Sequence, residues 1–352
     1  MIGQYGWSDR LARDFAAQAG AGQVPGRVVV QQRNGYRVAT DAGEAPAKAS
    51  GRLLHEGGEA GPPAVGDWVA LSPAAGDGAA TIHAVLPRRT ALVRRAAHSA
   101  ATVQVIAANI DVAFVVASMN ADLNPRRIER YLAAIWQSGA RPVVALTKAD
   151  LSAEPEAQAA RVAALAIDCP VVVVSARQGL GLEALLAQVA PGETCVLLGS
   201  SGVGKSTLVN AFLGEARMAT QAIREADDQG RHTTSHRQLV RLPGGGLIID
   251  TPGMREVGLI GADDGLSAVF EDIEALVAAC RFSDCGHGGE PGCAVRGALE
   301  SGALDPARWA HFQKLGLELA AGQAKAEQAL KEAERRVHKS YRAARKADRD
   351  AG

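Results

Sequence analysis

A glycine-rich loop carries the residues best suited to chemistry in this chain. The loop follows the apolar run Val196–Leu198 and opens a segment of helical pattern. In a strand, loop and helix of this kind, backbone N–H groups cradle phosphate at the helix start, Lys205 reaches the β- and γ-phosphate oxygens, and Ser206 binds Mg²⁺. We therefore predict a nucleoside triphosphate site here, rather than a chance glycine-rich turn. The loop residues are Gly199, Ser200, Ser201, Gly202, Val203, Gly204, Lys205, Ser206 and Thr207.

A second segment suited to phosphate and Mg²⁺ lies further along the chain. The apolar run Leu247–Ile249 ends in Asp250, and Gly253 follows. An aspartate at the end of such a strand holds Mg²⁺ directly or through water, and the Gly253 N–H can meet the γ-phosphate. Its place after the glycine-rich loop makes this segment the expected magnesium partner.

The residues that select the base precede both segments. Lys148 can lay its aliphatic stem across a guanine ring, Asp150 can accept hydrogen bonds from guanine N1 and N2, and the loop at Ser175 and Ala176 can offer a backbone N–H to O6. These residues favour GTP over ATP. Thr147 stands where Asn is usual and can make one hydrogen bond to the local scaffold. A solvated Lys and Asp after a strand is the alternative.

The order of these segments predicts a rearranged fold. In an ordinary GTPase the phosphate-binding loop comes first, whereas here Thr147–Asp150 precedes Gly199–Thr207. The same strands and loops joined in another order would place every group correctly. We therefore predict a circularly permuted GTPase domain.

A polar segment, Gly230–His236, lies between the two phosphate-facing segments and suits a mobile switch. One threonine hydroxyl is expected to coordinate Mg²⁺ while the γ-phosphate is bound. We assign Thr234 to this catalytic role, with Thr233 as the alternative. Met254 stands where many GTPases carry a water-orienting glutamine, so we expect slow intrinsic hydrolysis. His232 is the candidate replacement, and a solvated loop histidine is the other interpretation.

Three cysteines and a histidine cluster after the switch region in the pattern Cys-x4-Cys-x-His-x5-Cys. The residues are Cys280, Cys285, His287 and Cys293, with glycines between them. Four N and S ligands with no evident open position describe a structural tetrahedral zinc site, whereas a catalytic zinc would keep a water. Reduced cysteines in a loop are the alternative. Since the other two cysteines stand alone in strand-like runs, a metal site fits better than a disulfide framework.

The C-terminal stretch Lys331–Arg349 is basic and has a helical pattern. Such a helix can track RNA phosphates, and a solvated charged helix is the alternative. Its basic residues include Arg335, Arg336, Lys339, Arg342, Arg345, Lys346 and Arg349.

The length, composition and charge of the chain limit the class of protein that it can be. The chain has 352 residues, 47% of them hydrophobic, and a formal net charge of +0, so it is globular, long enough for two or three domains, and without global attraction to nucleic acid. Its first residues lack the blocks of a signal peptide, and its apolar runs are too short to span a bilayer. We expect a cytoplasmic protein, and a monomer because no dimerisation heptad is evident.

The secondary-structure elements that must position the sites follow two sequence patterns. A helix is expected at Ser8–Ala21, with Ser8 as its N-cap. Five short strands then suggest an OB-fold barrel: Val28–Val30, Tyr36–Val38, Arg52–Leu54, Asp67–Leu71 and Thr81–Val85. Later apolar runs alternate with helical segments and predict a parallel α/β sheet: Val112–Ala117, Pro142–Leu146, Val171–Val174 and Thr194–Leu198. A helical segment at Leu266–Ala279 leads into the cysteine cluster.

We therefore expect a multidomain protein with an OB-fold barrel, a central circularly permuted α/β P-loop GTPase domain and a mostly helical zinc-binding domain. The boundaries are an N-terminal helical extension at 1–22, the OB-fold at 23–96, the GTPase domain at 97–262, the zinc-binding domain at 263–310 and a basic helical tail at 311–352.

From about residue 26 to residue 300, the permuted motif order and the Cys, Cys, His, Cys spacing resemble the ribosome small subunit-dependent GTPase A family, known as RsgA or YjeQ. The resemblance implies a bacterial factor acting late in assembly of the 30S subunit, bound to 16S rRNA, stimulated by that subunit and released after hydrolysis. It implies that His232 matches the histidine of the family's second GTPase motif. Thr147 departs from the family pattern, as does Ser235, where a third threonine is common.

The sequence leaves three functional classes to be compared. The leading hypothesis is a GTP hydrolase switched on by the 30S subunit and using GTP, Mg²⁺ and one Zn²⁺ per chain. The second is a nucleotide-gated RNA clamp whose hydrolysis is incidental, an option that Met254 keeps open. A P-loop kinase is disfavoured because Thr147–Asp150 and Ser175–Ala176 together select guanine and no lid for an acceptor is evident.

Overall fold

The computed structural model describes residues 2–32, 35–55, 61–74, 76, 78–96, 99–120, 123–166, 168–214, 237–250, 266–267, 269–321, 323–324, 328 and 331. The chain divides into two compact units. The first comprises Met1–Leu92 and Val105–Val257, and the second comprises Val93–Gln104 and Gly258–Gly352.

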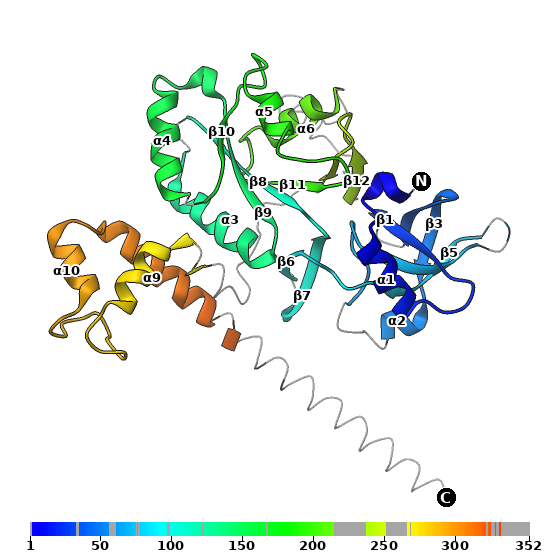
Figure 1. Ribbon diagram of the computed structural model, residues 1–352, viewed down its shortest axis with the longest axis horizontal. Helices are drawn as coiled ribbons and strands as arrows, with labels where there is room; N and C mark the ends of the chain where they lie inside the picture. The colour runs from blue at the N-terminus through cyan, green and yellow to red at the C-terminus, as the bar shows by residue number, and fades with distance from the viewer. Residues whose placement is uncertain are drawn as a thin grey trace, which may run out of the picture. The chain divides into compact units, whose positions relative to one another are not determined.

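Five strands of the first unit close into a small barrel (Figure 1). In order of pairing they are β1 (Val24–Gln32), β2 (Gly35–Thr40), β3 (Gly43–Ala49), β5 (Ala80–Val85) and β4 (Trp68–Ser72), with β4 returning to β1. The pairs are antiparallel except for β3 with β5, which is parallel. Val28, Val38, Val69 and Ile82 fill the interior. The predicted OB-like barrel is thereby confirmed.

One of the predicted barrel strands is wrong. Arg52–Leu54 lies in the short helix α2 (Gly51–His55), and β3 is the third strand instead. Ser50 starts this helix, since its Oγ accepts a hydrogen bond from Leu53 N at 3.2 Å, and Leu53 packs against the barrel core. The strand β3 escaped detection because its sequence has no β-branched or aromatic residue.

The N-terminal segment covers the barrel with two short helices. A 3-10 helix η1 (Ile2–Tyr5) precedes α1 (Asp9–Gln18), and Ser8 caps α1 as predicted, its Oγ accepting from Leu11 N. Between the helices, Trp7 contacts the Trp68 ring edge-on, with centroids 4.9 Å apart. This aromatic contact fixes the segment on the barrel.

The second half of the first unit is a mostly parallel sheet. Its order is β10 (Val171–Val173), β9 (Arg141–Thr147), β8 (Val112–Ser118), β11 (Thr194–Leu198), β13 (Leu247–Asp250) and β12 (Arg237–Arg241). Only β12 runs antiparallel to its neighbour β13. The parallel strands therefore end at one edge, where loops of α/β proteins bind ligands.

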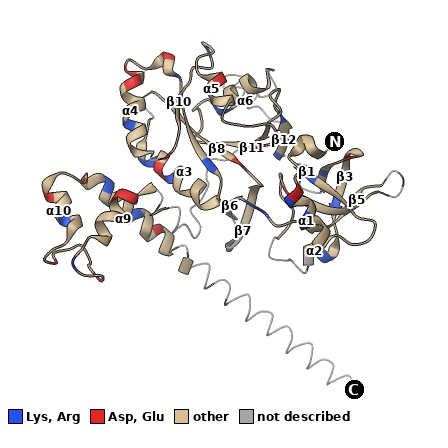
Figure 2. Ribbon diagram, in the orientation of Figure 1, with Lys and Arg blue, Asp and Glu red and all other residues tan. Residues whose placement is uncertain are grey.

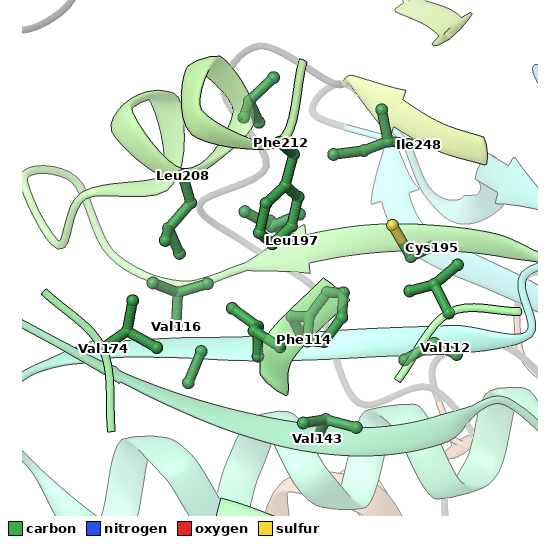
Figure 3. Packing of buried hydrophobic residues seen from close by; sticks show 14 of the residues in the cluster. Val112, Phe114, Val116, Val143, Val174, Cys195, Leu197, Leu208, Phe212 and Ile248 are labelled. Carbon is green, nitrogen blue, oxygen red and sulfur yellow. The ribbon is translucent and has the colours of Figure 1, made fainter. Parts of the chain in front are cut away.

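Helices cover both faces of this sheet. They are α3 (Pro125–Ser138), α4 (Pro155–Leu165), α5 (Leu182–Leu186) and α6 (Lys205–Leu213), with a 3-10 turn η2 (Ala149–Leu151) after β9. Figure 3 shows Leu208 and Phe212 of α6 pointing at Leu197 and Phe114 of the sheet, while α3 lies on the opposite face. The rings of Phe114 and Phe212 meet edge-on at 6.1 Å. Burial of this apolar layer holds the loops at the sheet edge in place.

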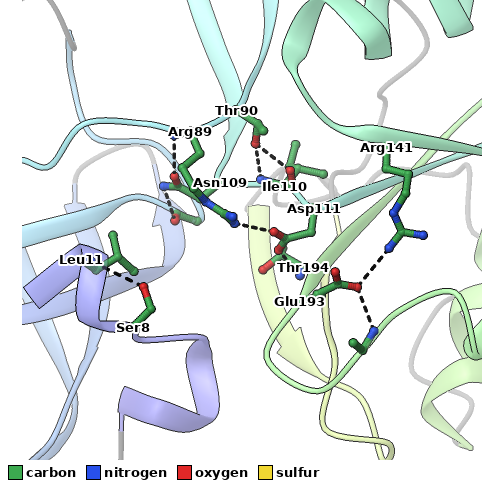
Figure 4. A network of polar contacts seen from close by, with 12 residues as sticks. Ser8, Leu11, Arg89, Thr90, Asn109, Ile110, Asp111, Arg141, Glu193 and Thr194 are labelled. Carbon is green, nitrogen blue, oxygen red and sulfur yellow. Dashed lines mark hydrogen bonds and ion pairs between the residues drawn. The ribbon is translucent and has the colours of Figure 1, made fainter.

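The barrel and the GTPase sheet share backbone hydrogen bonds. Strand β1 pairs antiparallel with β12, placing Val30 opposite Gln238 and Gln31 opposite Arg237. Strand β12 therefore joins two sheets into one of eleven strands. A second joint involves Asp111, which accepts hydrogen bonds from Arg89 and from Thr194 N (Figure 4). These contacts make the barrel and the GTPase sheet one compact unit.

The second unit contains helices α9 (Glu271–Ala278) and α10 (Ala294–Ser301), and a further helix at 306–321. Phe270 anchors them, since its ring contacts the rings of His311 and Phe312 at 5.9 and 5.5 Å. The charged residues of α9 are all acidic, whereas α10 carries both an arginine and a glutamate (Figure 2). Strands β6 (Ala91–Ala96) and β7 (Ser99–Ala108) form a separate two-stranded sheet. Among the described residues, no helix is long and apolar enough to cross a membrane.

Candidate functional site

The phosphate loop, Gly199–Thr207, joins β11 to α6 as predicted. Its first residue must be glycine: Gly199 has φ +150°, and a Cβ there would lie 2.3 Å from Val116 O. Gly204 caps α6 with φ 102°, so the first amides of the helix follow the loop directly. An N-terminus of this kind attracts anions through its unpaired N–H groups and the helix dipole.

The lysine and serine of the loop lie at this helix start. Lys205 Nζ donates to Gly199 O at 2.7 Å and to Ser200 O at 2.6 Å, which holds the ammonium across the mouth of the loop. Ser206 and Thr207 follow in the first turn of α6. The loop thus brings a cation, a hydroxyl and helix amides together, the groups that bind a nucleotide's phosphates and Mg²⁺.

Thr147 ties the phosphate loop to the end of β9. Its Oγ1 lies 2.5 Å from Val203 O and 3.2 Å from Ala117 O, and its one proton can be donated to either carbonyl. The side chain is only 4% exposed. The predicted hydrogen bond from Thr147 to the scaffold thus has two possible acceptors, and the nearer one belongs to the phosphate loop.

The two loops predicted to read guanine, Thr147–Asp150 and Ser175–Ala176, are joined by hydrogen bonds. Ser175 Oγ donates to Asp150 Oδ1 at 2.7 Å, and Ala149 N donates to Val174 O at 3.2 Å. Lys148 adopts a left-handed backbone with φ 58°, so it leaves the strand direction. These bonds give the Asp150 carboxylate a fixed direction, which a base-reading acceptor requires.

A contact from α3 to the phosphate loop was not predicted from the sequence. Arg127 Nη1 donates to Ser200 Oγ at 2.8 Å, and the Tyr131 hydroxyl hydrogen-bonds the same serine. Burial raises the pKa of Tyr131, although Arg127 and the bond to Ser200 oppose this shift. Arg127 and Tyr131 are four residues apart and therefore share a helix face. The sequence shows that these two side chains share one face of the helix, but only the fold shows that this face meets the phosphate loop.

Asp250 ends β13 at the same carboxyl edge as the phosphate loop, where its strand pairs with β11. Ser206 and Asp250 are the two predicted Mg²⁺ ligands that the structure describes. His232, Thr233, Thr234 and Gly253 lie outside the described residues, and their predicted roles stay predictions.

The cysteine and histidine cluster comes together in the second unit. Cys280 Sγ, Cys285 Sγ, His287 Nδ1 and Cys293 Sγ all lie within 4.8 Å of one another. His287 Nδ1 is 3.6 Å from the sulfurs of both Cys280 and Cys293, and those sulfurs are 4.0 Å apart. A tetrahedral zinc with bonds of about 2.3 Å to sulfur and 2.0 Å to nitrogen places its ligands roughly 3.5–3.8 Å apart. The donor set and its spacing fit zinc.

Neighbouring groups prepare these ligands. Arg296 N donates to Cys293 Sγ at 3.4 Å, and the His287 ring packs edge-on against Trp309. The pKa of Cys280 is lowered: burial alone would raise it, but the N–H groups of Val295 and Ala294 at the start of α10 outweigh that effect. The helix start thus favours the thiolate of Cys280, the form that binds metal. At Cys285 the His287 N–H lowers the pKa, but burial and the two neighbouring sulfurs outweigh it and raise that pKa to about 11.

Comparison with known proteins decides the family. Residues 85–260 match the RsgA GTPase family. A protein of Opitutus terrae named small ribosomal subunit biogenesis GTPase RsgA is 46% identical over 100% of this chain and 99% of its own length. One of the same name from Streptomyces coelicolor is 48% identical over 89% of this chain and 85% of its own length. The chain belongs to the RsgA GTPase family.

Solved structures agree with the architecture of this RsgA-family protein. YjeQ from Thermotoga maritima matches with a TM-score of 0.63 and 26% identity, covering 85% of this chain and 99% of its own. YloQ, described as a circularly permuted GTPase, matches with a TM-score of 0.59 and 22% identity, covering 86% and 96%. The second likeness concerns the fold alone.

These findings confirm three predictions: the family, the classification as a GTPase, and the fold of barrel, permuted GTPase domain and helical module with a Cys₃His cluster. Permutation is also visible in the sheet, because β11 and its phosphate loop follow β8, β9 and β10 in the chain yet occupy the middle of the sheet. As a GTPase of this family, the chain uses GTP, GDP and Mg²⁺.

Proposed function

We propose that this protein is a GTP hydrolase that acts late in assembly of the small (30S) ribosomal subunit, and that the subunit stimulates hydrolysis, which releases the protein. One observation carries the proposal: a phosphate loop tied by Thr147 to guanine-reading residues shares a chain with a Cys₃His cluster. Relatives that are 46% and 48% identical to this chain are named small ribosomal subunit biogenesis GTPases.

The guanine base would lie against the two guanine-reading loops. Asp150 accepts from N1 and N2, Lys148 covers the ring, and the Ala176 N–H donates to O6. Ser175 supports this assignment, because its hydroxyl holds one oxygen of Asp150 at 2.7 Å and so orients the carboxylate. Adenine offers the wrong donors and acceptors to such a carboxylate, so GTP is preferred to ATP.

The triphosphate would lie along the phosphate loop. Loop amides and Lys205 bind the β- and γ-phosphates, while Ser206, Asp250 and Thr234, with Thr233 as the alternative, hold Mg²⁺. The bound Mg²⁺ neutralises the charge that develops on the phosphates. We assign His232 to orienting the attacking water, since Met254 cannot do so.

The remaining parts would serve the ribosome. One Zn²⁺ per chain, held by Cys280, Cys285, His287 and Cys293, keeps the glycine-rich loop of the second unit folded. The barrel, the zinc module and the basic stretch Lys331–Arg349 contact 16S rRNA, the last through phosphates. We infer that the protein acts in the cytoplasm, because its partner is the ribosomal subunit, and as a monomer, because no dimerisation heptad is evident in the sequence.

GTP turnover measured with purified ribosomal particles tests this proposal. We expect slow turnover by the protein alone and strong stimulation by 30S subunits, with much less by 50S subunits or 70S ribosomes. Lys205→Ala is the matched control, because it should abolish the stimulated rate while leaving the zinc content unchanged. An equal rate with and without 30S subunits would contradict the ribosomal assignment.

A second candidate is a nucleotide-gated RNA clamp whose hydrolysis is incidental. Met254 favours it, because a thioether cannot position a water for attack. Single-turnover hydrolysis separates the two functions: a clamp would bind and leave 30S subunits on nucleotide exchange without faster cleavage, whereas the enzyme would cleave GTP faster on the subunit.

A further inference from the structure

The loop between Cys285 and Cys293 contains an acidic residue, Glu290, that is not part of the Cys, Cys, His, Cys ligand pattern. Glu290 Oε1 accepts a hydrogen bond from Gly286 N at 2.9 Å, and Glu290 Oε2 accepts from both Gly288 N and Gly289 N at 2.9 Å. Both carboxylate oxygens are thereby used. Three amides of the loop that carries His287 converge on a single side chain.

This convergence matters because the loop is conformationally free. Gly286, Gly288 and Gly289 have no side chains that could pack, and His287 between them is left-handed with φ 58°. The left-handed conformation is strained for a residue with a side chain. Successive amides around a left-handed residue form a concave anion-binding nest. Glu290 fills the nest and offsets the strain.

The amides bound by Glu290 are separate from those that serve the sulfurs. Cys293 Sγ accepts from Arg296 N at 3.4 Å, at the start of α10. Without Glu290, the glycine amides would lose their acceptor and the turn at His287 would lose its support. The Nδ1 atom of His287 now lies 3.6 Å from two ligand sulfurs, and that position depends on the turn.

We propose that Glu290 is a positioning residue of the metal site: its carboxylate holds the loop around His287 in the ligand geometry and so slows release of the metal. The inference rests on the zinc occupancy proposed above. It assigns no contact between Glu290 and the ion, and it does not depend on the ribosomal role.

Two variants at Glu290 test the proposal against one control. Glu290→Ala removes both acceptors, whereas Glu290→Gln keeps one acceptor oxygen and places an N–H₂ group against the other amides. Glu300→Gln is the control, because Glu300 lies in the same module, is exposed, and bonds Arg296 Nε at 2.7 Å without touching the loop. All variants are compared in the full chain.

The primary readout is the rate of zinc release to a coloured chelator, with the visible spectrum of the Co²⁺-substituted protein as the second. We expect release from Glu290→Ala to be about ten- to a hundredfold faster, the range found when partners of metal ligands are removed. Glu290→Gln should fall between it and the wild type, and the Co²⁺ bands of Glu290→Ala should shift or broaden. Glu300→Gln should match the wild type in both readouts.

The outcomes separate this proposal from the zinc assignment itself. Wild-type release from Glu290→Ala, with unchanged Co²⁺ bands, would overturn the positioning role while leaving zinc binding intact. A wild-type protein that binds neither Zn²⁺ nor Co²⁺ would overturn the site and the inference together. If Glu290→Ala does not fold, the decision passes to Glu290→Gln, in which a release rate equal to that of Glu300→Gln would refute the proposal. Binding of a fluorescent GDP checks that the first unit stays folded.

Discussion

At the scale of single residues, one hydroxyl links two of the predicted nucleotide-binding segments. Thr147 stands where asparagine is usual, and its Oγ1 lies 2.5 Å from Val203 O of the phosphate loop. Asparagine could add a second contact through its larger amide. Threonine keeps the hydrogen bond to the phosphate loop but cannot make this second contact.

Thr147→Val should therefore weaken GDP binding about five- to tenfold, because it keeps the shape but leaves the Val203 carbonyl without its donor, a loss of roughly 1–1.5 kcal/mol. Thr147→Ser is the matched control, since it retains the hydroxyl and loses only a methyl group. Fluorescence titration with a labelled GDP measures both affinities. Equal affinities for the two variants would contradict the role given to the hydroxyl.

At the scale of elements, Arg27 of β1 joins the barrel to the GTPase sheet. The side chain is 2% exposed and donates to the carbonyls of Tyr5, Gly66 and Asn109 and to Thr194 Oγ1. Its guanidinium also lies 5.3 Å from the Trp68 ring centroid. Burial lowers the pKa of Arg27 to about 10, and the group stays charged at neutral pH. One fork of donors therefore satisfies acceptors from four separate segments.

Arg27→Met should lower the thermal unfolding midpoint on the order of 6–12 °C, because about 3 kcal/mol or more is lost when buried acceptors lose a shared cation. Arg37→Met serves as the control. Arg37 is 48% exposed and lies 3.6 Å from Glu44, and a surface pair of this kind contributes about 0–1 kcal/mol. Differential scanning calorimetry of the zinc-loaded proteins measures both shifts, and similar shifts would refute the special role of Arg27.

The elements that could be predicted from the sequence are those set by residues close together in the chain. Ser8 predicted the start of α1, the apolar runs predicted β8, β9, β10 and β11, and the ligand spacing predicted the Cys₃His cluster. These features depend on residues close in sequence. The hydrogen bonding of β1 with β12 and the bond from Arg127 to Ser200 do not. Their partners are far apart in the chain, so no local period or cap could reveal them.

At the scale of the whole molecule, a net charge of +0 conceals an uneven distribution. Acidic residues outnumber basic ones between Leu266 and Ala321, and α9 carries three acids in its first turn. Basic residues outnumber acidic ones in Lys331–Arg349. Phosphate attraction should therefore arise from the C-terminal stretch, and the module with the Cys₃His cluster should dock by shape and specific contacts instead.

This distribution predicts the salt dependence of binding to 30S subunits. Removing residues 331–352 should weaken binding at low salt and flatten the plot of log affinity against log salt by about 3, if roughly half of the eight Lys and Arg residues meet phosphates. Glu271→Gln is the control in the acidic module: it lies on α9, changes one charge and should leave the slope unchanged. Filter binding across a series of KCl concentrations gives the slopes. An unchanged slope after truncation would contradict the phosphate contacts assigned to the C-terminal stretch.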